Sequence, residues 1–243
     1  MANRFEQGPP IATPTSVKVV LGLIFCASIL AALFDRWFLY FFQLSLTKDL
    51  LSISWTGLHR YFLWQPFTYF FIEEASNGID FSFLFNLAFK CYIISVTGGT
   101  ICMRYKERLF IILTLGASLL GALSLLPYLA IDAPILVVSG CTALFFSLIV
   151  FWSMMNNDGT IMLLFAFPIS VKWLLSLLFI GTFFMCLYNS DWATFSLAFF
   201  GSLWAYLWAT IGYGLRTPYD WTYSWDDALE RLGSSKIRRF KKK

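Results

Sequence analysis

The stretch LFIILTLGASLLGALSLLPYLA, residues 109–130, runs for 22 residues without a charged side chain. An α-helix needs about 20 apolar residues to cross the hydrocarbon core of a bilayer. The whole chain has the same character: of its 243 residues, 58% are hydrophobic, 20% are aromatic and only 13% are charged. One aqueous core cannot bury so much apolar surface, whereas lipid solvates it directly. The sequence therefore predicts an integral membrane protein and excludes a water-soluble fold.

Five further stretches have the length and composition of membrane spans. With the first they make six predicted crossings, at 17–34, 81–103, 109–130, 135–155, 161–187 and 192–214. The segment 35–80 is too polar for an ordinary span, but it is rich in Trp, Tyr and Phe. Such side chains settle at the headgroup level of a bilayer. We expect an all-α bundle of six transmembrane helices, with 35–80 as a membrane-embedded interfacial loop.

The connections between the spans carry an uneven share of Lys and Arg. With the N-terminus inside, one side collects Arg4, Lys18, Arg104, Lys106, Arg108, Lys172 and the C-terminal tail, and leaves Arg36, Lys48 and Arg60 outside. Because cytoplasmic connections are enriched in Lys and Arg, both termini are predicted to be cytoplasmic. The chain then divides into an N-terminal segment 1–16, a membrane domain 17–215 and a tail 216–243. We favour the bacterial inner membrane over the endoplasmic reticulum.

The tail has two features of a membrane-surface segment. Trp221, Trp225, Leu229 and Leu232 recur at helical spacing, which predicts a short amphipathic helix. The last eight residues, 236–243, then carry six of the 18 basic groups. Such a cluster gains about 1 kcal/mol per basic residue from anionic lipid. The tail therefore predicts contact with lipid, as a topology anchor or as a partner site, and not nucleic-acid binding.

Cysteine and histidine give no metal or disulfide framework. The five cysteines form no C-x-x-C pair, and each lies in or beside an apolar run: Cys26, Cys91, Cys102, Cys141 and Cys186. The single histidine, His59, cannot form a zinc site that needs several ligands of its type. We expect neither a bound metal nor a cofactor.

Small residues form stripes in two of the predicted spans. Helices in hydrocarbon approach closely where such residues recur four apart, because their backbones can touch. The stripes are Gly201, Ala205, Ala209 and Gly212 in the last span, and Ser139, Ala143 and Ser147, with Gly140 beside them, in the fourth. We expect the fourth and sixth spans to pack together there.

Polar residues share one face of the second span. Ser82, Asn86 and Lys90 are spaced four apart, and Lys90 lies near the middle of the span. A cation at that depth is costly in lipid, so it faces protein or a water-filled cavity, unless it snorkels to the interface. The spacing favours a cavity with polar walls.

The motifs in these spans resemble those of the rhomboid superfamily, the six-span intramembrane serine proteases and their inactive relatives, including derlins. Trp64-Gln65 stands where the family carries Trp-Arg, and Phe81–Asn86 is similar to the second-span motif HxxxN. Gly140-Cys141-Thr142-Ala143 falls where the proteases have GxSG. Gly201 and Ala205 match the second half of HxxGxxxG in the sixth span. The resemblance covers about 15–214 and implies the six-span fold.

The same comparison indicates that the chemistry of the proteases is missing. The positions of the nucleophilic Ser and its His base are Thr142 and Ala198, and Ser82 replaces the second-span His, leaving Asn86. A hydroxyl is a poor nucleophile without a base. The resemblance therefore implies a pseudoprotease that binds transmembrane segments of client proteins without cutting them. We expect client contacts at Ser82, Asn86, Lys90, Thr142 and Trp204.

Two other functions stay open at this point. A lysine can act as a general base when burial lowers its pKa, so Lys90 could activate Thr142 or Ser139 in an intramembrane endopeptidase. The polar stripe and Lys90 also suit a small transporter or channel, although the six spans show no internal repeat.

Overall fold

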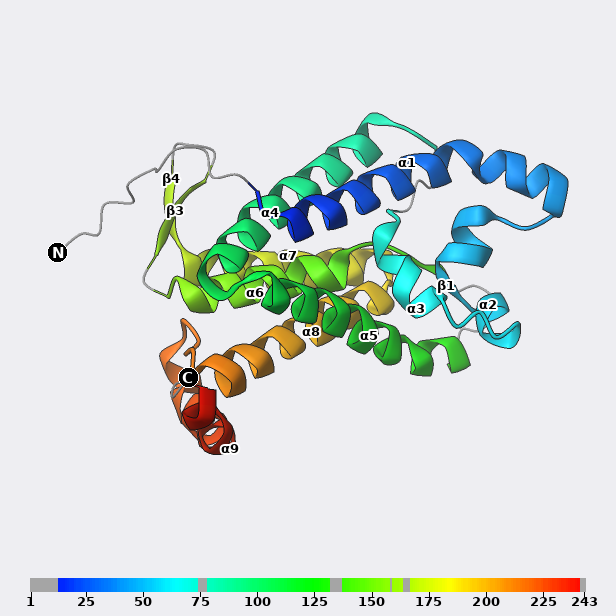
Figure 1. Ribbon diagram of the computed structural model, residues 1–243. Coiled ribbons are helices and arrows are strands. Elements are labelled where there is room, and N and C mark those ends of the chain that lie inside the picture. Colours follow the sequence, from blue (N-terminus) through cyan, green and yellow to red (C-terminus); the bar gives the residue numbers. More distant parts are fainter. Residues whose placement is uncertain (1–12, 74–77, 132–136, 158, 164–166, 241–243) are drawn as a thin grey trace.

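The computed structural model describes residues 13–73, 78–131, 137–157, 159–163 and 167–240. Most of the predicted N-terminal segment 1–16 and the last three lysines of the tail lie outside these ranges. Within them, the protein is an α-helical bundle (Figure 1). Five helices are long and apolar enough to cross a membrane: α1 (Thr15–Phe42), α4 (Phe81–Tyr105), α5 (Glu107–Ile131), α7 (Val171–Asn189) and α8 (Trp192–Leu207) taken with its continuation to Gly212. The chain is therefore a multi-pass α-helical membrane protein.

A sixth, shorter helix, α6 (Thr142–Met155), lies in the middle of the bundle and is buried along nearly its whole length. Its closest neighbour is α8. A Cβ added to Gly201 of α8 would overlap the carbonyl oxygen of Ala143 in α6. The small residue is needed there because the two backbones touch. The predicted packing of these two helices is thus seen at Gly201 and Ala143, and Ala205 is fully buried one turn later.

The fourth predicted span begins later than the sequence indicated. Residues Val137–Val138 form strand β2, which pairs antiparallel with β1 (Ile53–Ser54). Gly140 follows with φ +113°, a backbone conformation that L-residues rarely adopt and that cannot continue into a helix. Helix α6 therefore starts at Thr142, and the predicted helical stripe from Ser139 to Ser147 is wrong in its first turn: Ser139 and Gly140 precede the helix.

The first and fifth predicted spans also differ from the structure. Helix α1 continues to Phe42, so the predicted loop starts at Gln43 and not at residue 35. Asp35 supports this extension, because its carboxylate accepts hydrogen bonds from Thr47 and Ser45 just after the helix. The fifth helix starts at Val171 and not at 161, because Thr160–Leu163 (β3) and Phe167–Ser170 (β4) form an antiparallel hairpin. Pro168, which lacks an N–H, also disfavours a helix there.

The segment between α1 and α4 folds into short helical turns that bond to one another. These are η1 (Leu46–Leu51), α2 (Trp55–His59), α3 (Gln65–Thr68) and η2 (Tyr69–Phe71). Three consecutive carbonyls of η1 accept side-chain bonds from around α3: Asp49 from Gln65 Nε2 at 2.8 Å, Leu50 from Trp64 Nε1 at 2.9 Å and Leu51 from Thr68 Oγ1 at 2.8 Å. Trp64 and Gln65, which the motif comparison singled out, therefore hold this loop together.

Three hydroxyl groups fasten this loop to the bundle. Tyr69 donates to the carbonyl of Ser118 in α5 at 2.9 Å, and Ser118 donates to the carbonyl of Pro66 at 2.7 Å. Burial raises the pKa of Tyr69, which keeps this donor protonated. On the other side, Ser28 of α1 donates to the carbonyl of Phe71 and accepts from the backbone N–H of Glu73. The loop end at Glu73 is thus held against the spans.

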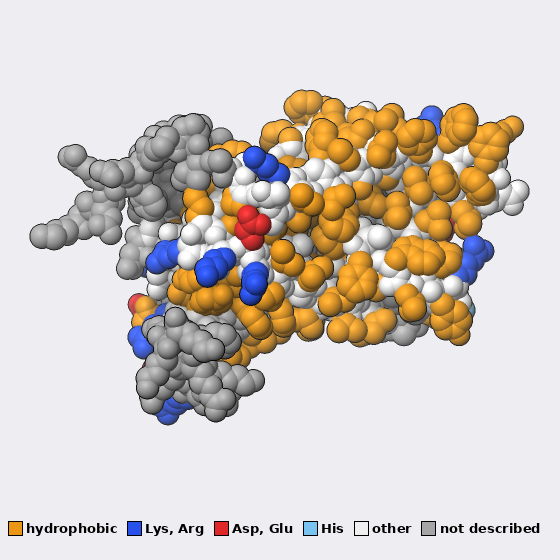
Figure 2. Space-filling model, in the orientation of Figure 1, with side chains coloured by type: hydrophobic (Ala, Val, Ile, Leu, Met, Phe, Trp, Pro, Cys, Tyr) orange, Lys and Arg blue, Asp and Glu red, His pale blue; other side chains and the backbone are white. Residues whose placement is uncertain are grey.

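The surface separates into an apolar body and a charged end. Figure 2 shows hydrophobic side chains over most of the bundle, and several Lys and Arg side chains at the end where α9 lies. Helix α9 (Tyr223–Phe240) follows the turns η3 (Trp208–Gly212) and η4 (Asp220–Thr222) and runs across that end of the bundle (Figure 1). The predicted helix of the tail is thus present, but it begins after Trp221.

Candidate functional site

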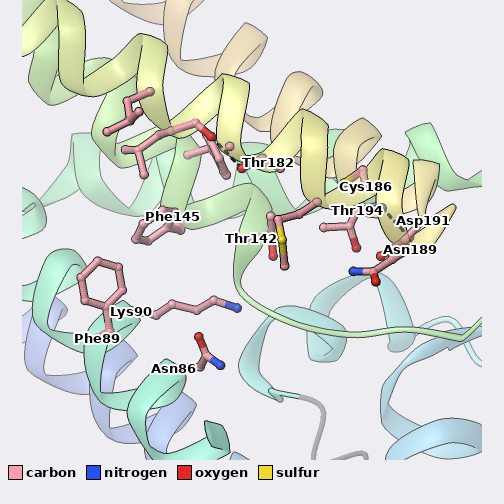
Figure 3. Close-up of a pocket in the computed structure, with 15 residues that line it drawn as sticks. Asn86, Phe89, Lys90, Thr142, Phe145, Thr182, Cys186, Asn189, Asp191 and Thr194 are labelled. Carbon is pink, nitrogen blue, oxygen red and sulfur yellow. Dashed lines mark hydrogen bonds between the residues drawn. The ribbon is translucent and has the colours of Figure 1, made fainter.

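A cavity of about 460 Å³ lies between α4 and α7, with the start of α6 between them. Its polar lining residues come from α4, α6, α7 and α8 and from the turn before α8: Asn86, Lys90, Thr142, Thr182, Asn189, Asp191 and Thr194. Figure 3 shows Asn86 and Lys90 below Thr142, and the Asn189, Asp191 and Thr194 group on the far side. Phe89, Phe145, Phe146, Leu177 and Leu178 complete the wall. The cavity therefore has polar and apolar parts side by side.

Lys90 forms an ion pair inside the bundle. Its ammonium donates a hydrogen bond to Glu73 Oε1, and only 21% of the Lys90 side chain and 15% of the Glu73 side chain are exposed. The partner comes from the end of the loop, 17 residues before Lys90. Because the carboxylate supplies the opposite charge, the cation is tolerated in the middle of α4.

The second oxygen of Glu73 lies beside the start of α6. A Cβ placed on Gly140 would be 3.5 Å from Glu73 Oε2 and 3.7 Å from Thr142 Oγ1. Oε2 is buried and accepts no hydrogen bond from the described residues. The unbonded N–H groups at a helix N-terminus carry partial positive charge, which favours a carboxylate nearby. Glu73 therefore links three elements: the loop, α4 and the N-terminus of α6.

The Glu73 carboxylate is the acidic group described near Thr142, and its other oxygen is held in the ion pair with Lys90. No hydrogen bond between described residues reaches the hydroxyl of Thr142, and the position that the resemblance assigns to a base, Ala198, is an alanine that is fully buried in α8. Lys90 is an ammonium donor to Glu73, so it has no free lone pair with which to take a proton from Thr142 or Ser139. His59 packs against Trp55 in α2, outside the cavity.

The structure brings together three of the five predicted client contacts. Asn86, Lys90 and Thr142 line one cavity. Ser82 is exposed in the first turn of α4 and does not line it. Trp204 does not line it either: its Nε1 donates to the carbonyl of Ile112 in α5 at 3.2 Å, and its ring covers Gly116. Trp204 packs α8 on α5, because an indole needs both apolar area and an acceptor.

Sequence reasoning missed the opposite side of the site. Glu73 ends an aromatic run, and its position gave no sign of contact with Lys90. Asn189 and Asp191 lie at the turn between α7 and α8, where Asp191 also accepts a bond from the Thr194 N–H at 3.1 Å. Two polar side chains directly after an apolar span, followed by a Thr three residues on, are a signal for such a helix start.

Within the described ranges, no three His, Cys, Asp or Glu side chains come together as a metal-binding group would require. Neither the protein-family models nor the curated proteins compared with this chain match it. The arguments for its function are therefore those of the fold and the cavity.

Proposed function

We propose that this chain is a rhomboid-like pseudoprotease, which binds transmembrane segments of client proteins in the cavity between α4 and α7 and does not cleave them. The observation that carries this proposal is the cavity itself. It joins polar groups to aromatic and aliphatic walls inside the apolar part of the bundle, and the hydroxyl at the motif position, Thr142, has no hydrogen bond to a described side chain.

The proposal includes six crossings, with α6 as the fourth. In support, β2 before α6 pairs with β1 of the loop at one end, while Arg104 at the end of α4 donates to the carbonyl of Met155 at 3.4 Å. At 14 residues, α6 is short for a span that faces lipid. A helix surrounded by protein does not need that length, because the protein can satisfy the backbone on either side of it. The loop 43–80 is proposed to lie half in the bilayer, which its exposed Tyr61, Leu63 and Trp64 favour.

The chemistry of the cavity suits a client helix that lipid solvates poorly. Amide or hydroxyl groups in a span lose their hydrogen bonds to water, and Asn86, Thr142 and Asn189 offer replacements. Of the five long helices, α7 has the smallest buried share, 17% of its most apolar window against 56% for α5. A loosely packed wall can move aside for a helix, because it breaks fewer contacts.

The orientation remains part of the proposal. The ends of α4, α5 and α7 that carry Arg104, Lys106, Arg108 and Lys172 lie on the same side as α9 (Figures 1 and 2). By the charge bias of membrane proteins this side is cytoplasmic, together with both termini, and we favour the bacterial inner membrane over the endoplasmic reticulum.

Photocrosslinking to a defined reporter tests the proposal. The protein carries a benzophenone amino acid at Asn86 or at Met185, an exposed residue on the other wall, and is reconstituted with a single-span reporter. A reporter with two central Asn residues should crosslink several-fold more than an all-Leu reporter, at full length. The control site is Leu33 on α1, which is exposed and outside the cavity. Equal crosslinking from Leu33, or no preference between reporters, would contradict the proposal.

A further inference from the structure

The chain between α8 and α9 is tied to the end of α6 and to α7. The side-chain amide of Asn157, just after α6, donates to the carbonyl of Thr217 at 3.1 Å. The hydroxyl of Tyr219 donates to the carbonyl of Lys172 in α7 at 2.9 Å and lies 2.7 Å from the hydroxyl of Ser176. The approach to α9 is therefore fixed on the end of the bundle.

A buried carboxylate fixes the first turn of α9 as well. Asp226 is 1% exposed, and its two oxygens accept hydrogen bonds from the hydroxyl of Tyr206 in α8 at 2.7 Å, and from the N–H and the hydroxyl of Thr217 at 3.0 and 2.8 Å. Three donors compensate the loss of water around a buried charge. Because Tyr206 lies near the end of a membrane-spanning helix, these bonds hold α9 at the level where that helix leaves the lipid.

The free face of this region carries two tryptophans. Trp221 and Trp225 are 78% and 69% exposed, four residues apart, and Ala228 beside them is also exposed. The neighbouring Asp226 faces the bundle instead. A tryptophan at the end of a bundle is most stable at the headgroup level of the membrane, where its ring contacts apolar chains and its N–H contacts polar groups.

The charges at this end are complementary to anionic lipid. The exposed basic residues here include Arg104, Lys106, Arg108, Lys172, Arg216 and Arg231, and the exposed acidic ones include Glu107, Asp220 and Glu230. Arg216 is paired with Asp227 at 3.0 Å. Helix α9 itself continues through Lys236, Arg238 and Arg239. Figure 2 shows several Lys and Arg side chains at this end of the molecule.

We propose that α9 is an interfacial anchor of the membrane domain. Asp226 holds it parallel to the membrane surface, Trp221 and Trp225 enter the headgroup layer of the adjacent leaflet, and its basic residues select anionic lipid headgroups. This role is independent of client binding, since none of these residues lines the cavity between α4 and α7.

Hydrogen exchange of α9 in lipid nanodiscs tests the anchor. The full chain is compared in phosphatidylcholine and in phosphatidylcholine with 30 mol% phosphatidylglycerol. Exchange of α9 amides should be roughly tenfold or more slower in the anionic nanodiscs, since each basic residue near such a surface contributes about 1 kcal/mol and 1.4 kcal/mol is tenfold. The triple variant Lys236→Gln, Arg238→Gln, Arg239→Gln should lose this difference.

The tryptophans are tested separately. In phosphatidylcholine nanodiscs, Trp221→Ser with Trp225→Ser should speed exchange of α9, whereas Trp37→Ser, an equally exposed tryptophan in α1, should not. Exchange of α8 peptides reports whether the bundle is intact in each variant. Equal α9 exchange in the two lipids, or no effect of the paired tryptophan variant with α8 intact, would overturn the proposal.

Discussion

Glu73 and Lys90 form an ion pair between the end of the first loop and the middle of α4, and both side chains are largely buried. The pair explains how a lysine can lie in a membrane-spanning helix without reaching water. It also makes Lys90 a hydrogen-bond donor, which removes it as a base. The same pair thus fixes Lys90 at the wall of the cavity.

Breaking this pair from one side should destabilise the protein. Glu73→Gln leaves the ammonium of Lys90 without its counter-charge, at a cost of about 3 kcal/mol, the low end for buried pairs because both side chains keep some exposure. Thermal unfolding in one detergent measures the loss. The double variant Glu73→Gln with Lys90→Met should recover most of it. The single variant Lys90→Met completes the comparison. If the stability losses of the two single variants add up in the double variant, the residues are not coupled and the pair has no structural role.

The contact between α6 and α8 should not accept a larger residue. Gly201→Ala places a Cβ against the carbonyl of Ala143, and overpacking of this kind costs about 1–3 kcal/mol. Gly99→Ala in α4 is the matched control, since its Cβ would meet nothing within 4 Å and alanine favours a helix. The unfolding temperature should fall for the first variant only. Similar behaviour of both would show that the two backbones are further apart.

Gln65 should determine the order of the first loop. Gln65→Leu removes the donor to the Asp49 carbonyl and the acceptor for the Ser54 N–H, and an unsatisfied buried group costs about 1–3 kcal/mol. Hydrogen exchange across residues 46–57 should therefore quicken, while that of α5 stays unchanged. Arg60→Ala, an exposed change in the same loop, is the control. Unchanged exchange in Gln65→Leu would mean that other bonds hold the loop.

Much of the helical architecture could be predicted from the sequence, because length and hydropathy determine which segments cross lipid. The contact at Gly201 and Ala143 was also predictable, since small residues four apart define a face. The hairpin β3–β4 was not, because Ile161 to Phe167 is as apolar as a span. An apolar run by itself does not distinguish strands from a helical span.

The site was harder to predict than the fold. Asn86 and Lys90 are spaced four residues apart, so the sequence predicted that they lie on one face of the helix and line the same cavity. Glu73 reaches Lys90 only because the loop returns to α1, where Ser28 bonds its end. Trp204 lies outside the cavity, and helical spacing did not reveal that its ring contacts Gly116 of α5 while its neighbour Gly201 faces α6.

The most direct measurement of the central claim is a cleavage assay on purified protein in liposomes with a membrane-anchored reporter whose span contains central Asn residues. The reporter should remain full-length while it crosslinks from Asn86, and a fluorophosphonate probe should label the wild type and Thr142→Ala equally weakly. Cleavage of the reporter, or probe labelling, that disappears in Thr142→Ala would show an active hydroxyl at this position and contradict the account.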